Sequence, residues 1–208
     1  QMKVTWQRYY MYDILEASNV DYDQVLIVDA DTIVHPDCPN FFNETNGKYS
    51  AVRNKGSFEW VRRSMNVFST LLFPGDIPFK VWEYINCGFQ IVNKDHKEFF
   101  EYVRNYYLEN QQSVQNAIVN VKASTDQTII NFLLRQQNIE INYLPVCYNL
   151  QDLASKQLLY IHPSLWWLTD KLIFKECGYV FHFNAIPKTE MGRDANYWIK
   201  RTYEEFYK

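Results

Sequence analysis

The run Val25-Leu26-Ile27-Val28 is followed directly by two carboxylates, Asp29 and Asp31. A short apolar run rich in β-branched residues and bounded by polar groups predicts a strand covered on both faces. Such strands are typical of a parallel sheet with helices on each side. In α/β sheets of this kind, ligands bind beyond the carboxyl ends of the strands. The feature therefore predicts both a fold class and the place of a binding site.

The rest of the chain alternates between strand and helix patterns. Apolar periodicity predicts further strands near residues 49–52, 87–92, 139–144 and 179–183. It predicts helices over residues 3–17, 58–72, 95–108, 129–134 and 193–207. This alternation indicates an α/β fold with a mixed, mostly parallel sheet flanked by helices. We expect a single domain over residues 1–208, because no linker, internal repeat or low-complexity tract divides the chain.

Composition excludes several classes of protein. The chain is 47% hydrophobic and has only six glycines and seven prolines, which excludes disordered and collagen-like proteins. A net charge of -3 does not indicate nucleic-acid binding, and no apolar run is long enough to cross a bilayer. The four cysteines lack zinc-site spacing, so we expect buried thiols in a reducing compartment. The expected location is the cytoplasm or the cytoplasmic side of a membrane. The oligomeric state is left open.

The Asp29-Ala30-Asp31 motif points to a divalent cation. Side chains alternate along an extended segment, so both carboxylates lie on the same side. Two like charges this close repel each other, and a cation between them removes the repulsion. Mg²⁺ and Mn²⁺ bind one or two carboxylates together with phosphate oxygens. The competing interpretation is structural, with both aspartates capping the turn after the strand.

Two enzyme classes carry such a D-x-D motif. Haloacid-dehalogenase-type phosphohydrolases would use Asp29 as a nucleophile toward phosphate. They also need a downstream Ser or Thr, then a Lys, then an acidic pair. Gly75-Asp76 is the only hint of the acidic pair. Nucleotide-sugar glycosyltransferases instead use the motif to hold a metal that binds a diphosphate. A non-catalytic nucleotide-sugar-binding domain is a third interpretation.

A second polar cluster lies near the end of the chain. His182 follows a strand-like alternation, and Lys188 comes six positions later. A lone histidine in a strand is more often a hydrogen-bonded core residue. Neutral imidazole, however, is a ligand for Mn²⁺, and lysine supplies a point charge for phosphate. The pair therefore suits a site with a metal and a diphosphate, which favours the glycosyltransferase.

The order of these motifs resembles glycosyltransferase family 8, which includes glycogenin and bacterial lipooligosaccharide galactosyltransferases. That family has the GT-A fold and retains the anomeric configuration of its sugar. The matching segments are Asp29-Ala30-Asp31, Asn86-Cys87-Gly88 with Ile91-Val92-Asn93, Asp126-Gln127, and His182 with Lys188. The resemblance implies a nucleotide-sugar donor, with UDP as the nucleotide, and a glycan or other hydroxyl acceptor. It implies Mn²⁺, or Mg²⁺, as the cofactor.

The same resemblance implies roles for individual residues. Asp29, Asp31 and His182 would ligate the metal, and Asp29 would also lie against the donor. Asp126 would touch the donor sugar, and Gln127 would lie beneath its anomeric carbon, which makes them the candidate catalytic residues. The other residues implied in donor binding are Arg8, Asn86, Gly88 and Lys188.

Three features depart from the family pattern. Ala185 stands where the family usually has glycine, and the stretch between Arg8 and Asp29 is longer than usual. Family members also begin with a βαβ unit that holds the nucleotide base, and such a unit takes roughly 30 or more residues. The numbered sequence starts after that unit. We therefore expect that the chain is a fragment of a longer protein or holds the base in another way.

Overall fold

The computed structural model describes residues 2–121, 126–159, 172–187 and 193–208. Its α-helices are α1 (Val4–Gln7), α2 (Met11–Ala17), α3 (Phe58–Leu71), α4 (Lys97–Val121), α5 (Gln127–Gln136) and α6 (Ala195–Tyr207). Its strands are β1 (Gln24–Val28), β2 (Thr32–Val34), β3 (Tyr49–Arg53), β4 (Ile85–Asn93), β5 (Ile141–Leu144) and β6 (Val180–His182). None of the described helices is both long enough and apolar enough to span a membrane.

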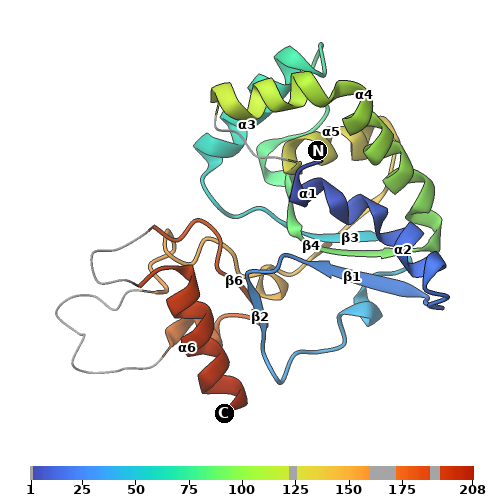
Figure 1. Cartoon of the computed structure of the whole chain (residues 1–208). Helices are drawn as coiled ribbons and strands as arrows, with labels where there is room; N and C mark the ends of the chain where they lie inside the picture. The colour runs from blue at the N-terminus through green and yellow to red at the C-terminus, as the bar shows by residue number, and fades with distance from the viewer. Residues whose placement is uncertain (1, 122–125, 160–171, 188–192) are drawn as a thin grey trace.

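Four strands form a mixed sheet in the order β1-β4-β3-β5 (Figure 1). β4 is antiparallel to both of its neighbours, whereas β3 and β5 are parallel. Strands β1, β3 and β5 therefore run in one direction and β4 runs in the other. The expected mixed sheet flanked by helices is confirmed. Most of the pairings are nevertheless antiparallel, because β4 is inserted between β1 and β3.

The strand before the D-x-D motif is not the covered central strand that its sequence predicts. Within the described residues β1 lies at the edge of the sheet and is half-buried, while β4 is central and buried except at its last residue. β1 is apolar at consecutive positions because Val25 and Ile27 pack on one apolar cluster and Leu26 packs on another. An edge strand with two apolar faces carries the same residue pattern as a central strand.

The helices α1, α2, α4 and α5 lie on one side of this sheet (Figure 1). The expected helix over residues 3–17 is divided by a 3-10 turn, η1 (Arg8–Tyr10). α4 continues beyond the expected end at residue 108, with non-helical backbone angles at Asn110. Of the four free cysteines only Cys87 is buried, so the expectation of buried thiols is wrong for the other three.

A second, two-stranded sheet joins two segments that lie about 150 residues apart in the sequence. β2 pairs antiparallel with β6, with Thr32 opposite His182. The Phe183 N–H extends this contact by donating to the Asp31 carbonyl (2.9 Å). α6 packs beside these strands and buries Trp198 against Phe181 and its neighbours. The short β2 strand, which the sequence did not predict, thus brings β6 next to the D-x-D motif.

Candidate active site

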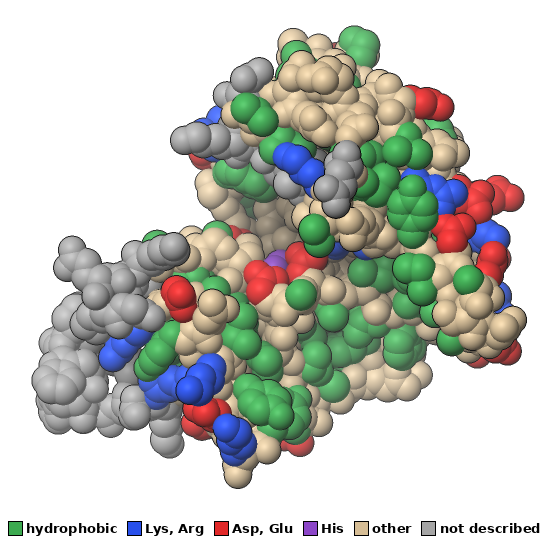
Figure 2. All heavy atoms as spheres, in the orientation of Figure 1, with side chains coloured by type: hydrophobic (Ala, Val, Ile, Leu, Met, Phe, Trp, Pro, Cys, Tyr) green, Lys and Arg blue, Asp and Glu red, His purple; other side chains and the backbone are tan. Residues whose placement is uncertain are grey.

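A cleft of about 600 Å³ opens beside the end of β1. In Figure 2 acidic side chains and a histidine lie together in a hollow of the molecular surface. Asp76, on which the phosphohydrolase interpretation depends, is not among the lining residues. Lys188 lies outside the described residues. The cleft is lined by all the other predicted site residues: Arg8, Asp29, Asp31, Asn86, Gly88, Asp126, Gln127 and His182.

Three of these side chains form a group that could hold a metal ion. One ligand atom each from Asp29, Asp31 and His182 lies within 4.8 Å of the others. His182 Nε2 is 3.1 Å from Asp31 Oδ1 and 3.5 Å from Asp29 Oδ2. The two carboxylates therefore share one side of the chain, as their spacing predicts. Hydrogen bonding to His182 lowers the pKa of the Asp31 carboxyl, although burial acts in the opposite direction.

The surroundings of this group fit a small hard cation. Two carboxylate oxygens and one imidazole nitrogen make a suitable donor set for Mn²⁺ or Mg²⁺. Gly88 leaves the space that the group needs, since a Cβ there would lie 2.5 Å from His182 Cε1 and 2.7 Å from Asp29 Oδ2. The His182 ring is buried, and its Nδ1 has no hydrogen-bond partner among the described residues. Nε2 faces both carboxylates and is therefore the nitrogen that would bind a cation held by this group.

Arg8 connects the Asp29, Asp31 and His182 group to the start of α5 on the other side of the cleft. Its Nη2 donates to Asp29 Oδ1 (2.7 Å), its Nη1 donates to the Cys87 carbonyl (2.6 Å), and its Nε donates to the Thr5 carbonyl (3.0 Å). Its Nε also lies 3.6 Å from Asp126 Oδ2. Burial acts against the charged form, but the nearby acidic groups outweigh it and raise the pKa of Arg8. A guanidinium has five N–H donors, so two have no partner among the described residues and could contact a ligand.

The start of α5 supplies the predicted catalytic pair. Asp126, the N-cap residue, is buried and accepts a hydrogen bond from the Tyr9 hydroxyl (3.2 Å). Gln127 Oε1 accepts from the Cys87 N–H (3.1 Å). Because a backbone N–H can only donate, the Gln127 oxygen must be the atom that faces it. The other polar atom of the Gln127 side chain, Nε2, is then a hydrogen-bond donor.

An irregularity in β4 aims the third group of side chains. Between Ala51 and Arg53 the register with β3 shifts, so that two steps along β3 oppose five along β4. Such bulges occur next to active sites, where they redirect side chains. Here Asn86 Oδ1 accepts from the Gly88 N–H (2.8 Å), which closes a local turn, and Asn86 lines the cleft. The apolar alternation predicts this strand but does not reveal the shift.

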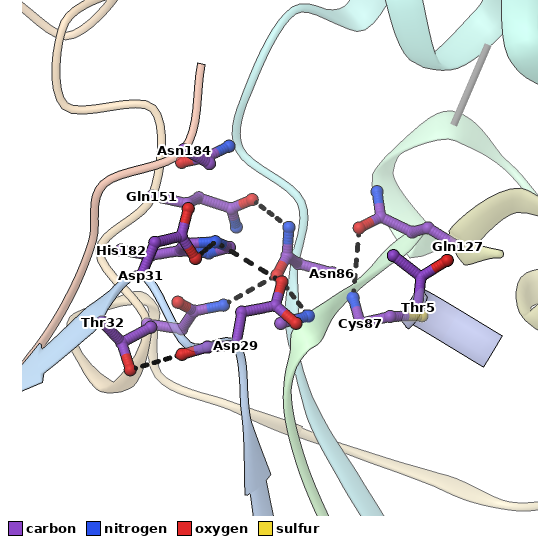
Figure 3. A network of polar contacts seen from close by, with 12 residues as sticks. Thr5, Asp29, Asp31, Thr32, Asn86, Cys87, Gln127, Gln151, His182 and Asn184 are labelled. Atoms are coloured by element: carbon purple, nitrogen blue, oxygen red, sulfur yellow. Dashed lines mark hydrogen bonds and ion pairs between the residues drawn. The ribbon is translucent and has the colours of Figure 1, made fainter. Parts of the chain in front are cut away.

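Two buried amides beside Asn86 were not predicted from the sequence. Asn149 Nδ2 donates to Asn86 Oδ1 (2.9 Å), and Asn86 Nδ2 donates to Gln151 Oε1 (2.7 Å). Figure 3 shows Gln151 and Asn86 side by side next to His182. These residues lie in an irregular segment after β5, where no periodic pattern marks a polar side chain that points inward. No pattern in the sequence indicates the hydrogen bond from the Tyr9 hydroxyl to Asp126 either.

Comparisons with solved structures agree with this architecture. The chain is similar to a glycosyltransferase involved in the glycosylation of the major capsid of PBCV-1, with a TM-score of 0.52 and 12% identity. The match covers 94% of this chain and 75% of that one. The chain has a GT-A-like glycosyltransferase fold.

Two further glycosyltransferases match with lower TM-scores. Mouse xyloside xylosyltransferase 1 matches at 0.45, with 11% identity over 88% of this chain and 65% of that chain. The WbbM bifunctional glycosyltransferase matches at 0.46, with 14% identity over 89% of this chain and 32% of that chain. No family model and no curated protein sequence matches the chain.

Proposed function

We propose that the chain transfers a sugar from a nucleoside diphosphate donor to a hydroxyl group of a glycan or another acceptor. The resemblance favours a UDP-sugar as the donor. The observation that carries the proposal is that Asp29, Asp31 and His182 meet in one cleft with Asn86 and Gln127. The GT-A-like fold supports it. The role of Lys188 in holding the diphosphate rests on the resemblance alone.

The metal-binding group would be Asp29, Asp31 and His182. A divalent cation bound there would supply positive charge opposite the leaving diphosphate, an effect worth several kcal/mol. Arg8 holds Asp29 in place, and the two N–H donors that it does not use within the described part of the chain could bind an oxygen of the donor. Arg8 thus acts both in positioning a metal ligand and in contacting the donor.

The reaction breaks the bond between the anomeric carbon and the diphosphate oxygen and forms one from that carbon to the acceptor oxygen. The acceptor proton passes to a phosphate oxygen of the leaving group. Gln127 is poorly suited to be a nucleophile, because its oxygen accepts a hydrogen bond from the Cys87 N–H. For the retention that the resemblance implies, we therefore propose attack on the same face as the departing phosphate and not a double displacement. Proton NMR of the product's anomeric configuration tests this, and an inverted product would contradict it.

The metal site is tested by Asp31→Asn. This variant keeps the shape of the side chain and removes the charge, so we expect metal-dependent transfer to fall by at least about 100-fold while thermal unfolding changes little. Asp23→Asn is the matched control, because Asp23 is exposed and does not line the cleft. Full activity of Asp31→Asn would contradict the assignment.

The donor is tested by thermal shifts with UDP- and GDP-sugars, each with and without MnCl₂. We expect stabilisation by one nucleotide class that requires the metal, and turnover with a suitable acceptor. Stabilisation without transfer or donor hydrolysis would instead indicate a binding domain. Metal-dependent hydrolysis of an aryl phosphate would favour the phosphohydrolase.

A further inference from the structure

Three buried amide side chains form a hydrogen-bonded chain along one wall of the cleft. Asn149 and Gln151 are fully buried, and Asn86 is 5% exposed. Asn86 lines the cleft, whereas Asn149 and Gln151 do not. Both therefore reach a ligand only through Asn86.

Backbone groups at two points fix the orientation of these amides. The Arg53 carbonyl can only accept, so it takes the Gln151 Nε2–H (3.0 Å), and Gln151 Oε1 then faces Asn86 Nδ2. The Gly88 N–H can only donate, so it must face Asn86 Oδ1. These two independent groups require the same orientation of the Asn86 amide. Asn86 is thus held in one of its two possible flips.

One hydrogen-bonding position of the Asn86 side chain has no partner among the residues that the structure describes. Its oxygen accepts from Gly88 and Asn149, which uses both lone pairs. Its nitrogen gives one of two hydrogens to Gln151. The second N–H can bind only an acceptor atom, such as a sugar hydroxyl oxygen.

The burial of the Asn149 amide supports a role in positioning Asn86. Its Oδ1 is buried and has no hydrogen-bond partner within the described parts of the chain. A buried amide with an unsatisfied oxygen opposes folding, and a leucine of similar size would avoid that. The presence of an amide at position 149 is explained by the hydrogen bond that its Nδ2 donates to Asn86 Oδ1.

We propose that Asn149 and Gln151 are positioning residues that hold Asn86 with one N–H presented to an acceptor oxygen of the donor's sugar. This inference rests on the proposed function. It separates the recognition of the sugar from that of the nucleotide and the metal, because within the described residues neither amide side chain is hydrogen-bonded to Asp29, Asp31 or His182.

The test measures binding of UDP, UDP-glucose and UDP-galactose in MnCl₂ by calorimetry. For Asn149→Leu and Gln151→Met we expect the nucleotide sugar to bind about 3- to 10-fold more weakly while UDP affinity is unchanged. Asn142→Leu is the matched control, since its amide donates to the Glu44 carbonyl and to Ser50, away from the cleft. If one variant does not fold, the other still removes one of the two amide contacts to Asn86. It therefore allows the same comparison between UDP and the nucleotide sugars.

A double-mutant cycle with Asn86→Asp tests whether the effect passes through Asn86. We expect that Asn149→Leu adds little once Asn86 has changed, whereas additive losses would overturn the inference. Equal losses for UDP and the nucleotide sugars, or no loss, would also overturn it. A wild-type protein that binds none of the three ligands would defeat the proposed function, and this inference with it.

Discussion

Gly88 lies where three side chains of the cleft converge. A Cβ at this position would lie under 3 Å from atoms of His182, Asp29 and Asn86. Its backbone conformation is open to other residues, because its φ is not among the positive values. The glycine is therefore needed for the space beside it and not for its flexibility.

We expect Gly88→Ala to weaken metal binding by about 10- to 100-fold, because His182 and Asp29 must both move. The added methyl group should also cost about 1–3 kcal/mol of folding stability. Metal titration and chemical unfolding measure the two effects. Gly47→Ala is the control, since it strains a positive φ but has no atom within 4 Å of the added Cβ. Unchanged metal affinity in Gly88→Ala would show that the group tolerates a wider spacing.

Ala185 carries a different kind of constraint. Its φ is 51°, in the left-handed region that favours glycine, and it stands where the resembled family usually has glycine. An alanine in this conformation costs about 1 kcal/mol relative to glycine. The departure from the family pattern is thus accommodated in the backbone at the expense of stability.

Ala185→Gly should therefore stabilise the protein, although glycine substitutions usually destabilise. We expect a gain of about 0.5–1 kcal/mol, or about 1–4 °C in melting temperature. Thermal unfolding measures it. Ala17→Gly, at a helical position of α2, must lower the melting temperature in the same assay. A lower melting temperature for both variants would contradict the left-handed conformation.

At this scale the sequence predicts the charged residues of the cleft but not the neutral ones that orient them. Asp29, Asp31 and His182 are detectable because alternation along extended segments puts each on a known side. Asn149 and Gln151 depend on the tertiary position of an irregular segment, which no local pattern encodes. Their role follows only from their hydrogen-bond partners.

At the scale of elements, α5 and β4 are joined by one buried side chain. Asn131 accepts from the Ile85 N–H (2.8 Å) and donates to the Ile85 carbonyl (3.1 Å). It also donates to the Gln127 carbonyl one turn earlier. The beginning of β4 and the N-terminal end of α5 are thereby fixed to each other, which places Gln127 against Cys87.

A titratable histidine, His96, lies just before the start of α4. η4 (Lys94–His96) precedes the helix, and buried His96 accepts the Asn93 N–H at Nδ1 (3.1 Å) in a capping box. Burial lowers the pKa of His96 below its ordinary value of 6.5. The unfolded chain therefore binds a proton before the folded one as the pH falls.

We expect the free energy of unfolding to decrease as the pH falls through about 6.5, and the His96 contribution to be complete above that value. His96→Gln keeps a neutral acceptor for the capping box and cannot titrate. Chemical unfolding between pH 7.5 and 5 should show a smaller pH dependence in this variant. The same slope in both proteins would assign the dependence to other groups.

Apolar patterns predict the existence of most elements here, but not their places in the sheet. β1 and β4 are both apolar runs, and their order depends on which neighbours they meet. α4 was predicted too short because the polar stretch around residues 109–113 hides its second half. β2 has three residues, which is too few to give a period.

At the scale of the whole molecule, the cleft draws on both sheets. Asp29, Asn86 and Gln127 come from the four-stranded sheet and the helix beside it, whereas His182 comes from the two-stranded sheet. Ligands that contact both walls therefore oppose any opening between the sheets.

We expect MnCl₂ with UDP to slow hydrogen exchange in β2 and β6 by up to about 100-fold at a ligand concentration of 100 times the Kd. Hydrogen-exchange mass spectrometry measures this by peptide. Asp31→Asn should show no slowing under the same conditions. Protection confined to peptides of the four-stranded sheet would contradict a ligand that contacts both walls.

The register of β2 against β6 has a consequence for how the protein matures. Thr32 and His182 are paired about 150 positions apart, so the imidazole reaches the aspartates only after a contact of very large sequence separation has formed. A slip of one residue would turn that ring to the opposite face. A metal ion held by this group would thus be unable to template early folding steps, and its uptake would mark a chain in which β2 and β6 have already paired in the correct alignment.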